Sequence, residues 1–84
     1  MSKFQKKLIK EYQLKGYTVL KTIRFNYNRY HDLLCMKNGE KDKWIESKEL
    51  SDTLKPLQKK RIDELIKLGK KSFCIQDVNG IIYP

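Results

Sequence analysis

The chain has 84 residues, a length that predicts one domain over residues 1–84 with a modest core. It carries 19 Lys and Arg against 10 Asp and Glu, for a formal net charge of +9. This excess favours a polyanionic partner, most simply nucleic acid, although a basic surface that only keeps the protein in solution is the simpler alternative. The apolar runs are too short for a signal peptide or a membrane span, which predicts an intracellular, cytoplasmic protein without a membrane partner.

The first predicted helix covers residues 2–15. Its apolar side chains recur at spacings of three and four, which forms one stripe for the core. Ser2 is placed to cap the helix and Gly16 to end it. Glu11 borders the stripe, so it either points toward a site or is a flanking surface charge, and the residues alone favour the surface charge. The stripe consists of Phe4, Leu8, Ile9 and Tyr12.

Residues 17–24 favour a strand because they are rich in β-branched side chains. The next segment, residues 25–30, alternates aromatic, amide and basic side chains. Such a segment either stacks on bases and grips phosphates or tucks its aromatic rings onto the core, and the pattern favours neither. His31 follows it and is expected to be partly exposed, as an incidental residue or a phosphate contact. The candidate nucleic-acid contacts here are Arg24, Asn26, Tyr27, Arg29 and His31.

Residues 32–48 predict a β-hairpin, because two apolar runs flank an Asn-Gly turn signal. Antiparallel pairing brings Asp32, near the start of the first arm, toward the end of the second arm. Glu46 and Lys48 lie there and share a face, since alternate residues of a strand point the same way. The turn length is open for residues 40–43, and a one-residue slip would send Asp32 to the wrong side.

The second helix is predicted from Pro56 to about residue 68, followed by a strand at 72–76 and a short last strand at 81–83. Gln58 precedes Ile62 by four residues, so it continues the inward stripe and needs a polar partner. The basic residues beside it either contact phosphate or form a solvated face. The expected core residues are Ile62, Leu65 and Ile66, and the basic residues are Lys59, Lys60 and Arg61.

The predicted order is helix, three strands, helix, strand and a short final strand. It indicates an α/β (α+β) fold with a mixed sheet, because the second helix can carry the chain across to a parallel strand. Cys35 and Cys74 each lie within an apolar run and lack metal-ligand spacing, which predicts buried free thiols.

The hairpin residues suit metal-dependent hydrolysis of a phosphodiester. Mg²⁺ prefers oxygen ligands, which Asp32, Glu46 and the main-chain carbonyl of Ser47 can supply. Lys48 can stabilise the phosphoryl charge or orient the attacking water, and Gln58 can position water, substrate or the lysine. An acidic-x-Lys triplet alone is a weak motif, and a surface ion pair is the alternative.

Three segments resemble the PD-(D/E)XK nuclease superfamily, and most closely its small VRR-NUC and Holliday-junction-resolvase-like nucleases. They read Asp-Leu-Leu-Cys-Met at 32–36, Trp-Ile-Glu-Ser-Lys at 44–48 and Leu-Lys-Pro-Leu-Gln at 54–58. The family pattern is a Pro-Asp pair, a Glu-x-Lys on the next strand and a Pro-x-Gln that opens a helix. The resemblance covers most of the chain, from residue 4 to 76. It implies a restriction-endonuclease-like core, Mg²⁺ or Mn²⁺ as cofactor, and cleavage of DNA.

Carried over by position, the resemblance makes Asp32 and Glu46 metal ligands, Lys48 the catalytic lysine and Gln58 the glutamine of the motif. Glu11 resembles the first-helix acid that some members use near the metal. His31 stands in place of the motif proline, a departure that concerns loop geometry more than chemistry. The resemblance also implies branched or structured DNA as substrate and a phage source. With the small size, it implies a homodimer.

Two other readings stay open. A double-stranded RNA-binding domain is also small and basic and runs helix, three strands, helix, but it ends with its second helix. A protein–protein interaction module with incidental charge predicts neither metal binding nor salt-sensitive DNA affinity.

Overall fold

The structure, a computed structural model, describes residues 2–22 and 31–84. Within them the fold is α+β, with two helices and a five-stranded mixed sheet in the predicted order α-β-β-β-α-β-β. Four candidate nucleic-acid contacts, Arg24, Asn26, Tyr27 and Arg29, lie outside the described residues. The elements are α1 (Lys3–Leu14), β1 (Thr18–Lys21), β2 (Leu33–Met36), β3 (Lys43–Lys48), α2 (Pro56–Lys67), β4 (Lys71–Gln76) and β5 (Gly80–Tyr83).

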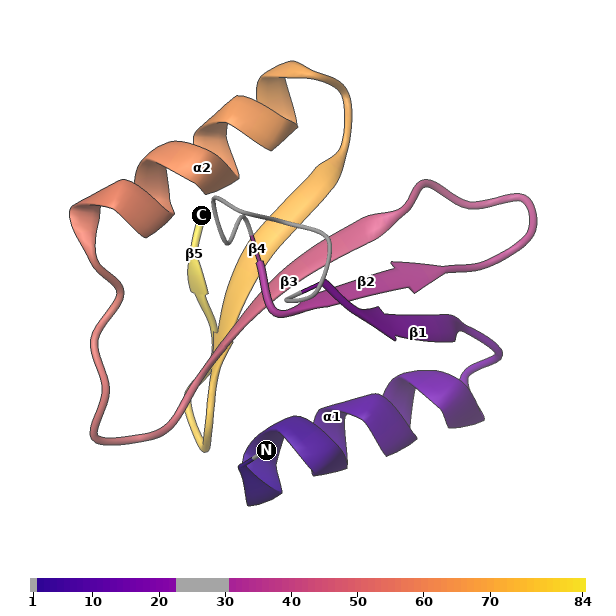
Figure 1. Cartoon of the computed structure of the whole chain (residues 1–84), viewed down its shortest axis with the longest axis horizontal. Helices are drawn as coiled ribbons and strands as arrows, with labels where there is room; N and C mark the ends of the chain where they lie inside the picture. Colours follow the sequence, from indigo (N-terminus) through magenta and orange to yellow (C-terminus); the bar gives the residue numbers. More distant parts are fainter. Residues whose placement is uncertain (1, 23–30) are drawn as a thin grey trace.

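The five strands lie in the order β1-β2-β3-β4-β5. Neighbouring strands are antiparallel except β3 and β4, which run parallel. A parallel pair cannot be joined by a tight turn, so α2 makes the connection between them. Helices α1 and α2 lie on opposite sides of the sheet (Figure 1). The β3 strand therefore presents alternate side chains to each helix.

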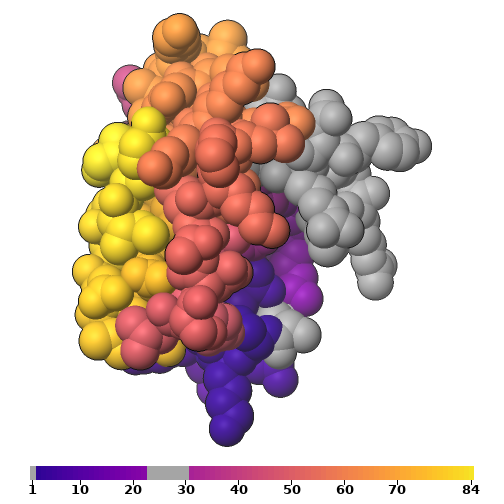
Figure 2. Space-filling model, turned by 90° about the vertical axis from the view of Figure 1, so that its left-hand side faces the viewer, coloured from indigo at the N-terminus to yellow at the C-terminus, as the bar shows by residue number. Residues whose placement is uncertain are grey.

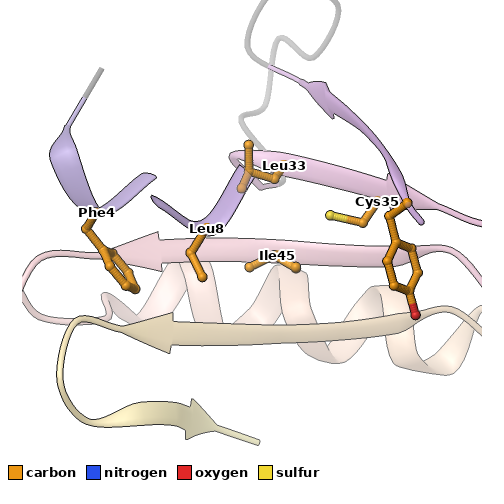
Figure 3. Packing of buried hydrophobic residues seen from close by; sticks show 6 residues of the cluster. Phe4, Leu8, Leu33, Cys35 and Ile45 are labelled. Atoms are coloured by element: carbon orange, nitrogen blue, oxygen red, sulfur yellow. The ribbon is translucent and has the colours of Figure 1, made fainter. Parts of the chain in front are cut away.

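The main core lies between α1 and the sheet (Figure 3). The predicted apolar stripe of α1 is confirmed, since Phe4 and Leu8 are buried while Ile9 and Tyr12 pack partly buried against the same cluster. The predicted cap is confirmed as well, because the Ser2 hydroxyl accepts a hydrogen bond from the main-chain N–H of Gln5 at 3.0 Å. The sheet and its first loop contribute Tyr17, Leu33, Cys35 and Ile45 to this cluster.

Helix α2 packs on the other face, against β4. Ile62 and Leu65 are buried there as predicted, but Ile66 is 41% exposed, so its predicted core position is wrong. Ile66 lies in the last turn of α2, where it lines an open groove with Phe73 of β4 and Ile81 of β5, so part of its side chain stays in contact with solvent. Within the described residues, neither helix is long and apolar enough to cross a membrane.

Both cysteines are buried free thiols, as predicted. Burial raises the pKa of Cys35 and of Cys74 to about 11. Both therefore stay protonated at neutral pH and act as small apolar core residues.

The hairpin register resolves the open turn length. Strand β3 begins at Lys43, so residues 40–42 belong to the connection, and Gly39 supplies the turn with a φ of +83°. Leu33 pairs with Ile45, which places Asp32 one residue before β2 and beside the second half of β3. Strand β1 covers Thr18–Lys21, and residues 23–24 of the predicted strand lie outside the described residues.

Candidate active site

Asp32 is held against β3 by Ser47. The main-chain N–H and the hydroxyl of Ser47 both donate to Oδ2 of Asp32, each at 2.8 Å. The main-chain N–H of Asp32 donates to the carbonyl of Ile45 at 3.1 Å, which anchors the residue at the start of β2. Two donors on one oxygen fix the orientation of the carboxylate. The hairpin register thus brings Asp32 to the Glu46–Lys48 segment, as predicted.

Helix α1 contributes a residue that the sequence did not single out. Nε2 of Gln5 donates to Oγ of Ser47 at 3.2 Å, while the same hydroxyl donates to Asp32. The contact connects the first turn of α1 to the end of β3. A weak signal for it exists in the sequence, because Gln5 precedes Ile9 by four residues and so borders the apolar stripe.

Glu46 is buried and is oriented by the second helix. Its Oε1 accepts a hydrogen bond from Nε2 of Gln58 at 2.9 Å, and Nζ of Lys48 lies 3.7 Å from the same oxygen. Oε1 of Gln58 accepts from the main-chain N–H of Lys55 at 2.9 Å, so one side chain joins the start of α2 to β3. The inward orientation of Gln58 is confirmed, and Glu46 is the partner that it needed.

The electrostatics of Glu46 reflect its burial and a neighbouring acid. Burial, followed by the negative charge of Asp32, raises the pKa of Glu46 from 4.5 to about 7, although the Lys48 ammonium acts in the opposite direction. Two carboxylates are therefore close enough to repel each other in a site that water reaches poorly. Such a pair is stabilised in its ionised form by an added positive charge.

The donors available here fit a hard divalent cation. In the described parts of the chain, no three His, Cys, Asp or Glu side chains are placed to hold a metal ion. A cation would therefore use the carboxylates of Asp32 and Glu46 with main-chain oxygen, such as the Ser47 carbonyl, and water. Few protein ligands, all of them oxygen, suit Mg²⁺, because it keeps several of its own waters.

Glu11 is not brought to this group. Its side chain is exposed, and it lies six residues beyond Gln5 on α1, about 9 Å along the axis at the standard helical rise. Gln5, in the first turn, is the α1 side chain that the structure places at Ser47.

His31 is buried, so its predicted partial exposure is wrong. It is 2% exposed, and its Nε2 lies 2.7 Å from the hydroxyl of Ser72 on β4. The hydroxyl of Thr22 donates to its main-chain carbonyl. A side chain enclosed in this way acts in packing, and its predicted contact with a phosphate does not fit this position.

Lys59 and Lys60 are exposed on α2, as a phosphate contact requires. Nζ of Lys59 lies 5.8 Å from the ring centroid of Tyr83 on β5. Helix α2 and the C-terminal residues lie side by side on one outer surface (Figure 2). These lysines directly follow Gln58 in the first half of α2, the helix whose Gln58 contacts Glu46.

Two further residues at the site were missed. Oδ2 of Asp52, in the β3–α2 connection, lies 3.5 Å from Nζ of Lys48. Nε2 of Gln76 on β4 donates to the main-chain carbonyl of Asp52 at 2.8 Å. A partial signal was the spacing of four between Lys48 and Asp52, whereas nothing local identifies Gln76.

No family model matches this chain, and no curated protein matches it either.

Proposed function

We propose that this protein is a metal-dependent DNA endonuclease that hydrolyses phosphodiester bonds, with a restriction-endonuclease-like core of the PD-(D/E)XK type. The observation that carries the proposal is the convergence of Asp32, Glu46 and Lys48 where β2 begins and β3 ends. Gln58, at the start of α2, completes the group through Glu46. An acidic pair with a lysine and a helix glutamine is the combination that the resemblance implies.

When bound at this site, Mg²⁺ or Mn²⁺ would supply positive charge to the phosphoryl group and would lower the pKa of a water. The carboxylates of Asp32 and Glu46 would hold that cation, and Ser47 keeps Asp32 in one orientation through its two donors. Gln58 keeps Glu46 in place through its amide. The Lys48 ammonium, buried beside Glu46, stabilises negative charge that develops on the phosphoryl oxygens.

DNA is the proposed substrate. The net charge of +9 favours a polyanion, and exposed Lys59 and Lys60 continue from the site along α2. Branched or structured DNA, and action as a homodimer, extend the proposal on the basis of the resemblance and of the small size of the chain.

The sheet topology disfavours the double-stranded RNA-binding alternative. That domain ends with its second helix, whereas here α2 leads to β4, which pairs with β3 inside the sheet.

The test is cleavage of labelled duplex, flap and four-way-junction DNA with Mg²⁺, with Mn²⁺ and with chelator. We expect cation-dependent cutting by the wild type and none by Glu46→Ala, while the exposed control Glu49→Gln cuts normally. Salt-sensitive binding without cutting of any substrate would favour the binding module instead. Neither binding nor cutting would favour the protein–protein module.

A further inference from the structure

The Lys48 ammonium lies between two carboxylates, only one of which belongs to the proposed cation site. Its Nζ is 3.7 Å from Oε1 of Glu46 and 3.5 Å from Oδ2 of Asp52. The side chain of Lys48 is 7% exposed, whereas that of Asp52 is 52% exposed. Asp52 is therefore a partly solvent-exposed counter-ion of the lysine, whereas Glu46 is a buried one.

We propose that Asp52 is a positioning residue, which keeps the Lys48 ammonium at the site when Glu46 is engaged by a divalent cation. The inference rests on the proposed nuclease function. A cation bound to Glu46 neutralises the charge that attracts Lys48 and repels the ammonium directly. Without a second anion, the flexible lysine side chain moves outward to water. Asp52 supplies that anion from a position outside the carboxylate pair.

The main chain of the β3–α2 connection is held in place for this role. Gln76 pairs with Lys48 in the β3–β4 register. Its Nε2 donates to the carbonyls of Glu49 at 3.2 Å, Leu50 at 3.3 Å and Asp52 at 2.8 Å. Three contacts from one amide tie the connection to β4, so Asp52 has a defined position relative to Lys48 although it lies outside any helix or strand.

The carboxylate of Asp52 is also oriented. Its Oδ1 accepts a hydrogen bond from the main-chain N–H of Thr53 at 2.9 Å, which leaves Oδ2 directed to Lys48. This hydrogen bond first, and the Lys48 charge second, lower the pKa of Asp52 below its ordinary value. Asp52 therefore stays ionised at neutral pH, as a counter-ion must.

The test compares Asp52→Asn with Glu49→Gln, which removes an equal charge from the same connection. The Asn side chain keeps the acceptor for the Thr53 N–H, so the connection stays folded. On a DNA that the wild type cuts in Mg²⁺, we expect kcat to fall about tenfold in Asp52→Asn, with KM within about twofold. Equal kcat for Asp52→Asn and Glu49→Gln would overturn the positioning role.

A second measurement does not depend on cleavage. The ¹⁵N–¹H signal of the Lys48 ammonium, assigned by its loss in Lys48→Arg, reports whether the group is held or exchanges with water. With Mg²⁺ added, we expect the signal to persist in the wild type and in Glu49→Gln and to vanish in Asp52→Asn. A signal that persists in Asp52→Asn, in an enzyme that cuts, refutes the positioning role alone. A wild type that cuts no DNA refutes the nuclease and the positioning role together.

Discussion

Ser47 directs two donors at a single oxygen of Asp32. Its main-chain N–H and its hydroxyl each lie 2.8 Å from Oδ2, and Nε2 of Gln5 lies 3.2 Å from the same hydroxyl. The middle residue of the Glu-Ser-Lys triplet therefore contributes its own side chain to the site, in addition to the main-chain carbonyl proposed above as a cation ligand. Its two donors hold the carboxylate of Asp32, the residue just before β2, in one orientation and leave Oδ1 without a contact to Ser47.

Ser47→Ala should weaken cation binding and lower stability. The main-chain donor remains, but Asp32 loses one hydrogen bond and Gln5 loses its acceptor, so the free energy of unfolding should fall by about 1 kcal/mol. Because the Asp32 carboxylate is then held less firmly, the affinity of the proposed site for Mn²⁺ should fall several-fold. Urea unfolding and a Mn²⁺ titration measure both effects, with Ser51→Ala in the exposed connection as the matched control. Identical behaviour of the two variants would exclude the orienting role of the hydroxyl.

Gln58→Glu should separate the two tasks of this side chain. The new carboxylate still accepts from the Lys55 N–H and so keeps the start of α2. It can no longer donate to Glu46 when ionised and repels it instead, in a site where Asp32 already raises the pKa of Glu46. We expect lower stability at pH 8, by about 1–3 kcal/mol, and a smaller loss at pH 5. Thermal unfolding at pH 5 and pH 8 measures the loss of stability, with Gln58→Met as the uncharged comparison. An equal loss for Gln58→Glu at both pH values would contradict the repulsion.

Local pattern was enough to predict Gln58. A spacing of four before Ile62 placed it on the inward face of α2, and its chemistry then required a polar partner. The proximity of Asp32, Glu46 and Lys48 was predictable for a similar reason, because hairpin pairing and the alternation of side chains along a strand are local rules.

Gln5, Gln76 and the burial of His31 follow from contacts that no local rule supplies. Gln5 meets Ser47 across 42 residues, Gln76 meets Asp52 across 24, and His31 meets Ser72 across 41. Each depends on how α1 or β4 packs against the hairpin, and a polar side chain on its own indicates no partner. The predicted burial of Ile66 was wrong for a different reason. Its helical spacing fits the buried face of α2, but the groove that it lines is open to solvent.

Lys48→Ala should abolish cleavage and leave DNA binding largely intact. Lys48 is buried, so it contributes little to the outer surface that attracts phosphates, whereas the proposed mechanism requires its charge beside the phosphoryl group. A loss of at least about 100-fold in the single-turnover cleavage rate is expected, with a DNA Kd within about threefold. Fluorescence anisotropy with chelator gives Kd, and single-turnover cleavage gives the rate.

Lys60→Ala serves as the control, since removal of an exposed charge should weaken binding and its salt dependence instead. Normal cleavage by Lys48→Ala would exclude the assigned role.

Glu46 should make the cation-free protein less stable as the pH rises through neutrality. Its pKa is raised from 4.5 to about 7 in the folded state, so folding favours the protonated form. The stabilisation is complete below about pH 4.5 and is lost as the pH rises through about 7, by up to about 3 kcal/mol. Glu46→Gln cannot ionise at this position, so its stability relative to that of the wild type should rise between pH 5 and pH 8. Urea unfolding across this range in chelator measures the difference.

Mg²⁺ should restore wild-type stability at pH 8 and leave Glu46→Gln unchanged, because the cation binds the ionised carboxylate. Parallel pH profiles in chelator would show that Glu46 keeps an ordinary pKa and that the carboxylates do not repel as described.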